Sequence, residues 1–218
     1  MPEPVSDDSI VEIGAVEPAL RAEFPGLGLR YVSIGRGSGR SPREVKQRLR
    51  LLSDRFGGAQ AINLRHQPIP WAYRVFFRHI GLDPDEQPTP VEEVALQRML
   101  HGAFKSRNLL DDALTIAMVE SRVPVRAFDA DQIEARLWIR GSVEGEGLEG
   151  RPGDLPSGTL VIADAVRPVS LLFGALGSGR GVHPKTERMI LASVQVAGVP
   201  DIAVEEALWL AGDILNAG

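Results

Sequence analysis

The chain has 218 residues, no cysteine and a formal net charge of −5 at pH 7, with 44% hydrophobic and 24% charged residues. This composition is typical of a soluble globular protein, and the missing cysteine excludes disulfides, thiolate metal sites and a cysteine nucleophile. Because the balance is acidic, broad nucleic-acid coating is disfavoured and no DNA partner is expected. The N-terminus lacks a signal-peptide pattern and no apolar run is long enough to cross a membrane, so a cytoplasmic location is expected.

The first 60 residues predict two strands and two helices. Residues 10–35 read as a strand, a short helix and a second strand, and a flexible glycine-rich loop follows over 35–40. The segment 41–44, Ser-Pro-Arg-Glu, is typical of a helix start with Ser41 as the capping residue. This helix is expected to end at residues 57–58, both glycine. Its apolar stripe consists of Val45, Leu49, Leu52 and Phe56.

Helices dominate the middle of the chain and strands dominate the part after residue 122. Helices are predicted over 69–80, from residue 90 onward, over 109–121 and over 203–216. Strands are predicted over 123–128, 136–139, 159–163, 168–173 and 189–196. Because the helices come first and the strands follow, the order indicates the α+β class.

Two helix starts carry specific side-chain predictions. Thr89 is expected to cap the helix that begins at residue 90, with Glu92 returning a bond to the Thr89 amide. Asp111 and Asp112 have two interpretations: they activate a water, or they belong to the first turn of a helix. The second interpretation is favoured, because acidic side chains stabilise helix N-termini.

Common catalytic and cofactor-binding motifs are absent, so no catalytic residue is assigned and no cofactor is expected. The four histidines show no paired ligand spacing, and we expect no metal site. The glycine-rich loop over 174–181 has two interpretations of equal weight. Its backbone approaches a ligand closely and offers bare amide donors, or it is a flexible connection between two strands.

The segment 36–55 is the most basic part of the chain. It holds seven basic and two acidic residues, so seven minus two gives a local charge of +5. Arg43, Lys46 and Arg50 are candidate RNA contacts, because clustered cations bind a phosphate backbone through charge and counterion release. The alternative is a solvated helix face in an arginine-rich segment.

Several short motifs from residue 69 onward follow the order found in a known family. The segment 123–129, Val-Pro-Val-Arg-Ala-Phe-Asp, is similar to a Pro-Leu-His-Ala-Phe-Asp signature, and 160–164 is similar to a Val-Ile-Ala-Asp strand. Between them, 137–140 resembles a strand ending in arginine, and Thr186 follows a glycine-rich loop as in the family. The chain resembles a free-standing version of the B3/B4 editing domain of the bacterial phenylalanyl-tRNA synthetase beta subunit.

The resemblance implies a layered α+β fold with two β-sheets and helices packed on one side. It also implies an N-terminal α/β extension over residues 1–60 and a B3/B4-like domain over 61–218. In the synthetase, this domain accepts a mischarged aminoacyl-tRNA end and hydrolyses the ester, so tRNA or aminoacyl-tRNA is the expected partner. The expected pocket residues here are Thr115, Arg126, Phe128, Gly174 and Ser178.

Three polar positions depart from the family pattern. Thr115 stands in place of an asparagine, Arg126 in place of a histidine and Ala192 in place of an acidic residue. A guanidinium cannot act as a base at neutral pH, but it can bind a carboxylate or phosphate through two hydrogen bonds. Two functions stay open: trans-acting recognition or hydrolysis of mischarged aminoacyl-tRNA, and non-catalytic binding of a small anionic or amino-acid-like ligand. Whether the chain is an enzyme stays open with them.

Arg126 has three alternative environments, because a charged side chain in a partly buried pocket is costly unless it is paired. It forms an ion pair with Asp111, Asp112 or Asp129, it points into solvent, or it faces the pocket as the anchor for an anion. Only the third arrangement makes it part of a ligand site.

Overall fold

The computed structural model describes residues 10–218, and the N-terminal segment in which no signal peptide was expected lies outside this range. The strands are β1 (Glu12–Val16), β2 (Gly28–Ile34), β3 (Arg126–Asp129), β4 (Trp138–Gly141), β5 (Leu160–Ala163), β6 (Pro168–Leu171) and β7 (Met189–Gln195). The helices are α1 (Pro18–Glu23), α2 (Arg43–Arg55), α3 (Gly58–Leu64), α4 (Pro68–His79), α5 (Pro90–His101), α6 (Leu109–Ser121), α7 (Asp201–Ala217) and the 3-10 turn η2 (Ala130–Gln132). Each predicted element is present, and α3 is an additional helix that no sequence pattern predicted.

Within residues 10–218, the seven strands form one mixed sheet in the order β3-β7-β2-β1-β4-β5-β6. The α+β class is confirmed, but the expectation of two sheets is wrong. The reason is the parallel pairing of β1 with β4 at Ala15–Trp138 and Val16–Ile139. This pairing joins two groups of antiparallel strands into one sheet.

Strands β1 and β2 lie in the middle of this sheet, between β7 and β4. Strand β2 pairs with β7 over seven positions, from Gly28–Gln195 to Ile34–Met189. Its residues Leu29 and Ile34 are almost fully buried. Residues 12–34 therefore share their sheet and core with the strands of the second half of the chain.

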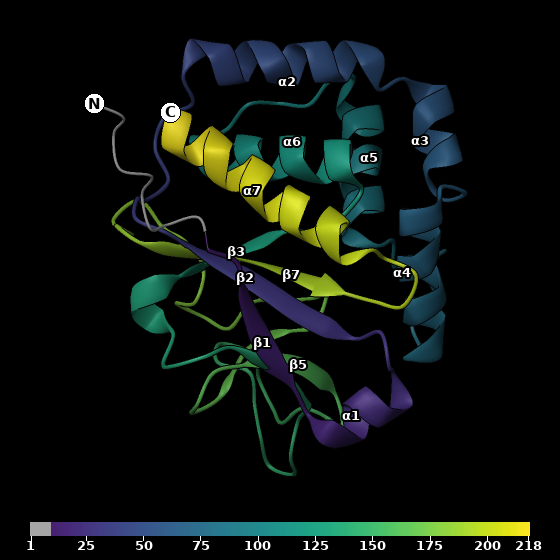
Figure 1. Cartoon of the computed structure of the whole chain (residues 1–218), viewed down its shortest axis with the longest axis vertical. Helices are drawn as coiled ribbons and strands as arrows, with labels where there is room; N and C mark the ends of the chain where they lie inside the picture. Colours follow the sequence, from purple (N-terminus) through teal and green to yellow (C-terminus); the bar gives the residue numbers. More distant parts are fainter. Residues whose placement is uncertain (1–9) are drawn as a thin grey trace.

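Helices α2, α5, α6 and α7 gather on one side of β2, β3 and β7 (Figure 1). Helix α6 is apolar on most of its surface and lies against α7, where Ile116 and Leu208 are completely buried. Helix α2 packs across α6 through Val45 and Leu49, because its apolar residues recur every three to four positions. No helix within residues 10–218 has the length and apolarity that a membrane span requires.

The sheet curls so that its two edge strands approach each other. Strands β3 and β6 are at opposite ends of the strand order. Nevertheless, Nη1 of Arg126 on β3 donates to the hydroxyl of Ser170 and the carbonyl of Leu171 on β6, at 2.8 and 2.9 Å. A side chain, rather than backbone pairing, therefore connects the edges.

Candidate functional site

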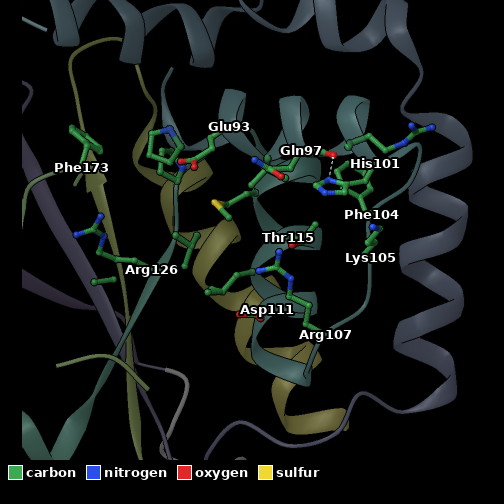
Figure 2. A pocket seen from close by; sticks show the side chains of 18 of the residues that line it. Glu93, Gln97, His101, Phe104, Lys105, Arg107, Asp111, Thr115, Arg126 and Phe173 are labelled. Carbon is green, nitrogen blue, oxygen red and sulfur yellow. Dashed lines mark hydrogen bonds between the residues drawn. The ribbon is translucent and has the colours of Figure 1, made fainter. Parts of the chain in front are cut away.

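A cavity of about 350 Å³ lies between helices α5 and α6, the loop 102–108 and the curled sheet. Thr115 of α6, Arg126 of β3 and Ala192 of β7 contribute to its wall. In Figure 2, Arg126 and Phe173 lie at one side of this pocket and Arg107 at the other, with Thr115 between them. The volume suits a small molecule or the end of a larger one.

The wall of the pocket combines an apolar surface with an excess of positive charge. Among the described residues that line it, four are basic and two are acidic, so four minus two gives +2. The basic residues are Arg98, Lys105, Arg107 and Arg126, and the acidic ones are Glu93 and Asp111. Apolar side chains include Leu114, Met118, Val125, Leu172 and Phe173. Such a lining favours a ligand with an apolar part and a negative charge.

Arg126 is held at the pocket wall without a carboxylate partner within residues 10–218. Its Nη1 donates to Ser170 and Leu171, and its Nη2 donates to the Gly174 carbonyl at 3.1 Å. Burial lowers the pKa of Arg126 to about 10, so the group is still a cation at neutral pH. A guanidinium has five N–H donors, so the Nε–H and one N–H of Nη2 have no partner within residues 10–218.

The predicted ion-pair partners of Arg126 are engaged elsewhere. Asp129 accepts from the Thr186 hydroxyl at 2.6 Å and lies 3.3 Å from the His183 ring. Asp112 accepts from two serine hydroxyls, and Asp111 accepts from the side-chain amide of Asn108 at 2.9 Å. Arg126 thus lines the pocket without an ion pair, and its guanidinium extends from the wall toward Ser170, Leu171 and Gly174.

Asp112 fixes the loop that forms the rim of the pocket. Its buried carboxylate accepts from the hydroxyls of Ser41 and Ser106, at 2.6 and 2.5 Å, and from the Arg107 amide at 3.1 Å. The expectation that Ser41 caps α2 is therefore not met, because its hydroxyl is bonded to Asp112 and Pro42 takes the capping position. The capping interpretation of the acidic pair is supported, since Asn108 accepts from the Asp111 amide at 2.8 Å in the first turn of α6.

The other predicted pocket residues lie in three different places. Phe128 is fully buried in the core, and Ser178 is exposed beside Glu149, to whose carbonyl its amide donates at 2.7 Å. Gly174 reaches Arg126 through its carbonyl. It also lines a second cavity of about 560 Å³ on the far side of residues 172–173. The structure thus brings Thr115 and Arg126 together in one pocket, with Gly174 behind Arg126.

Several pocket residues carried no sequence signal that marked them as such. Glu93 and His101 lie on the exposed part of α5, and Lys105 and Arg107 lie on the loop 102–108. This loop has no periodic pattern, so only its two cations just before the Asn108 cap could have drawn attention to it. The His101 ring is placed by a 2.9 Å contact between its Nδ1 and the Gln97 carbonyl.

Metal-ligating side chains do not converge in the described part of the chain. Within residues 10–218, no group of three or more histidine, aspartate and glutamate side chains is arranged to hold a metal ion.

The structure places a cavity with an excess of basic lining residues on an α+β scaffold. Residues 72–205 match the B3/4 domain family, and the chain belongs to that family. It is also similar to phenylalanine–tRNA ligase beta subunits. The protein of Legionella pneumophila (strain Lens) is 30% identical over 111 residues, which is 47% of this chain and 14% of that protein. The protein of Xanthomonas oryzae pv. oryzae (strain MAFF 311018) is 37% identical over 101 residues, 44% of this chain and 12% of that protein.

A relative with lower identity is also a phenylalanine–tRNA ligase beta subunit. The phenylalanine–tRNA ligase beta subunit of Aquifex aeolicus (strain VF5) is 27% identical over 116 residues, 52% of this chain and 14% of that protein. The similarity thus covers 12 to 14% of the length of these three relatives. The family match begins at residue 72, so β1, β2 and α2 precede it.

Proposed function

We propose that the chain is a tRNA-related binding module whose pocket takes the aminoacylated 3′ end of a tRNA. The main support is the state of Arg126. This residue is a cation at the pocket wall, and two of its N–H donors are used by no group in residues 10–218. A phosphate of the terminal nucleotides binds these donors through charge-assisted hydrogen bonds. The amino-acid side chain then lies against the apolar wall, at Leu114, Met118 and Phe173.

Family membership and the relatives support the tRNA part of the proposal. The relatives that the chain resembles are ligases for phenylalanine and tRNA, as their names state. The region shared with the Legionella protein covers about half of this chain, 47%. The chain itself is proposed to keep the recognition of an aminoacyl-tRNA end and not the ligase reaction.

Binding is favoured over hydrolysis because of the three positions that depart from the family pattern. Thr115, Arg126 and Ala192 offer neither a carboxylate nor an imidazole that could accept a proton from water. Arg126 stays protonated at neutral pH. The groups of the lining that can accept a proton lie elsewhere: Glu93 and His101 on α5, and Asp111 in the first turn of α6.

A binding experiment with three ligands tests the proposal: aminoacyl-tRNA, the same tRNA deacylated, and the free amino acid. We expect the wild type to prefer the aminoacylated end. Arg126→Gln should weaken that binding about tenfold to a hundredfold, since hydrogen bonds to a charged group contribute about 1.5–3 kcal/mol. Arg126→Lys should lie between the two, because it keeps the charge but loses the fork geometry.

The alternative is a binding module for a small anionic or amino-acid-like ligand that acts without tRNA. The modest size of the cavity, about 350 Å³, favours it as the second candidate. Tight binding of the free amino acid, with no gain from the tRNA, would establish this alternative. Equal affinity of wild type and a folded Arg126→Gln variant for aminoacyl-tRNA would overturn the proposal. Rapid deacylation of mischarged tRNA by the wild type would show that the pocket is catalytic.

A further inference from the structure

Helix α2 and the loop 102–108 run side by side in opposite directions. At the C-terminal end of α2, the Ser53 hydroxyl accepts from the Phe104 amide at 2.8 Å. At the N-terminal end, Ser41 and Ser106 share the Asp112 carboxylate. The loop therefore follows the length of α2, and it places α2 next to the rim of the pocket.

Five exposed or half-buried cations lie along these two segments. Arg43, Lys46 and Arg50 of α2 are three and four residues apart, so they share one face of the helix. That face borders the side of α2 that contacts the loop, because Ser53, seven residues after Lys46, is bonded to Phe104. Lys105 and Arg107 contribute from the loop itself, and both also line the pocket. We call these five residues the basic strip: Arg43, Lys46, Arg50, Lys105 and Arg107.

The side chains of the basic strip have no ion-pair or hydrogen-bond partner within residues 10–218. Arg48, on the other side of α2, differs: it pairs with Glu120 at 2.7 Å. Helix α2 also holds two acidic residues: Glu44 follows Arg43, and Asp54 lies one turn beyond Arg50, at the end of the strip. Five unpaired cations on two adjacent segments, two of which also line the pocket, can bind phosphates of one strand.

We propose that the basic strip holds the phosphates of a single-stranded RNA end and guides its terminus into the pocket. This inference rests on the proposed function of the pocket and extends it to α2, which precedes the matched family region. The strand crosses α2 and then the loop, where Lys105 and Arg107 bind the phosphates nearest to the pocket and to Arg126. The strip positions the RNA strand and does not read its sequence, because phosphate contacts carry no sequence information.

The test reverses the charge of the strip on α2 only. The strip variant is Arg43→Glu, Lys46→Glu and Arg50→Glu. The control variant is Arg21→Glu, Arg151→Glu and Lys185→Glu, which changes the net charge equally at exposed sites outside α2 and the loop. Binding of aminoacyl-tRNA and of the deacylated tRNA is measured as a function of salt concentration for wild type, both variants and Arg126→Gln.

We expect the strip variant to lose about two units of the slope of log K against log salt, since each single-strand phosphate contributes about 0.7. The control should keep the wild-type slope to within about half a unit of the same per-phosphate scale. The strip variant should still prefer the aminoacylated end, whereas Arg126→Gln should weaken binding of both tRNAs and lose only about 0.7 unit of slope, the share of one phosphate. An equal slope in the strip and control variants would overturn the proposal that the basic strip binds RNA phosphates.

The two proposals fail in different ways. If the wild type shows no preference for the aminoacylated end but the strip variant loses its slope, the proposed pocket function is wrong and the strip stands. If the preference is present and the slope is unaffected, the pocket stands and the strip is wrong. Binding of the wild type to vesicles of anionic lipid, lost in the strip variant and without any RNA binding, would also overturn the strip.

Discussion

The Arg74 guanidinium donates to the Glu92 carboxylate at 2.8 Å and thereby joins helix α4 to the first turn of α5. The same carboxylate accepts from the amide and the hydroxyl of Thr89, at 3.0 and 2.9 Å. The bond predicted from Glu92 to the Thr89 amide is confirmed. Because Arg74 and Glu92 are both buried, the helix cap is part of an ion pair that fixes one wall of the pocket.

Thr89→Ala should lower the free energy of unfolding by about 1 kcal/mol, the usual cost of losing a helix cap. Glu92→Gln should cost about 1–3 kcal/mol more, because it leaves the buried Arg74 with a weaker acceptor. Urea denaturation measures both. Glu93→Gln is the control: this neighbour is exposed, and we expect less than about 0.5 kcal/mol. Equal effects at Glu92 and Glu93 would contradict the ion pair as a stabilising contact.

Two glycines of the loop 35–40 should respond differently to alanine. A Cβ at Gly37 would overlap the backbone carbonyl of Thr186, whereas nothing lies within 4 Å of a Cβ at Gly39. We expect Gly37→Ala to destabilise the fold by about 1–3 kcal/mol, the range for overpacking. Gly39→Ala should be neutral or stabilise by up to about 1 kcal/mol, because it reduces the entropy of the unfolded chain. Thermal melts of the two variants check the contrast, which a similar loss at both positions would refute.

The pair Arg140–Glu146 should make stability depend on pH in the acid range. Arg140 donates two hydrogen bonds of 2.6 Å to Glu146, and these bonds lower the pKa of Glu146 below its ordinary 4.5. The stabilisation is therefore fully present above 4.5 and is lost as the pH falls through the lower pKa of the folded state.

The measurement compares wild type with Glu146→Gln by urea denaturation across the acid range. We expect the difference in unfolding free energy to be constant from about pH 6 to 7 and to shrink steadily below about pH 4.5. A difference that stays constant down to about pH 3 would mean that the pair does not contribute through the charge of Glu146.

The adjacent acids Asp111 and Asp112 should differ in their effect on stability. Asp112 is buried and accepts three hydrogen bonds, two from the pocket rim and one from Ser41, just before α2. Asp112→Asn should therefore cost about 1–3 kcal/mol, since a buried donor is left without its acceptor. Asp111→Asn should cost less than about 1 kcal/mol, the typical value of an acidic group at a helix start. Chemical denaturation checks the pair, and a larger loss at Asp111 would reverse their assigned roles.

Local patterns predicted the elements well because capping and apolar periodicity act within a few residues. Thr89 with Glu92, and the stripe through Val45 and Leu49, are examples. The number of sheets depended instead on the pairing of β1 with β4, which are more than 100 residues apart and share only two paired positions. The capping prediction for Ser41 failed for the same reason, since its hydroxyl donates to Asp112, which is 71 residues away in the sequence.

The site was predictable only where a family motif marked it. Thr115 and Arg126 were found through the resemblance, and both line the pocket. Lys105 and Arg107 were not found, because their position depends on the loop being tied to α2 through Ser53 and Asp112. No motif marks such a tertiary contact in the sequence.

The contact between Arg126 on β3 and Ser170 on β6 also bears on solubility. Edge strands expose unpaired backbone groups, and another chain can add to them to start aggregation. Both edges here are only four residues long, and a permanently charged side chain lies across the gap between them. A ligand that binds the two unused donors of Arg126 leaves this contact intact, so the gap between the edges stays covered when the pocket is occupied.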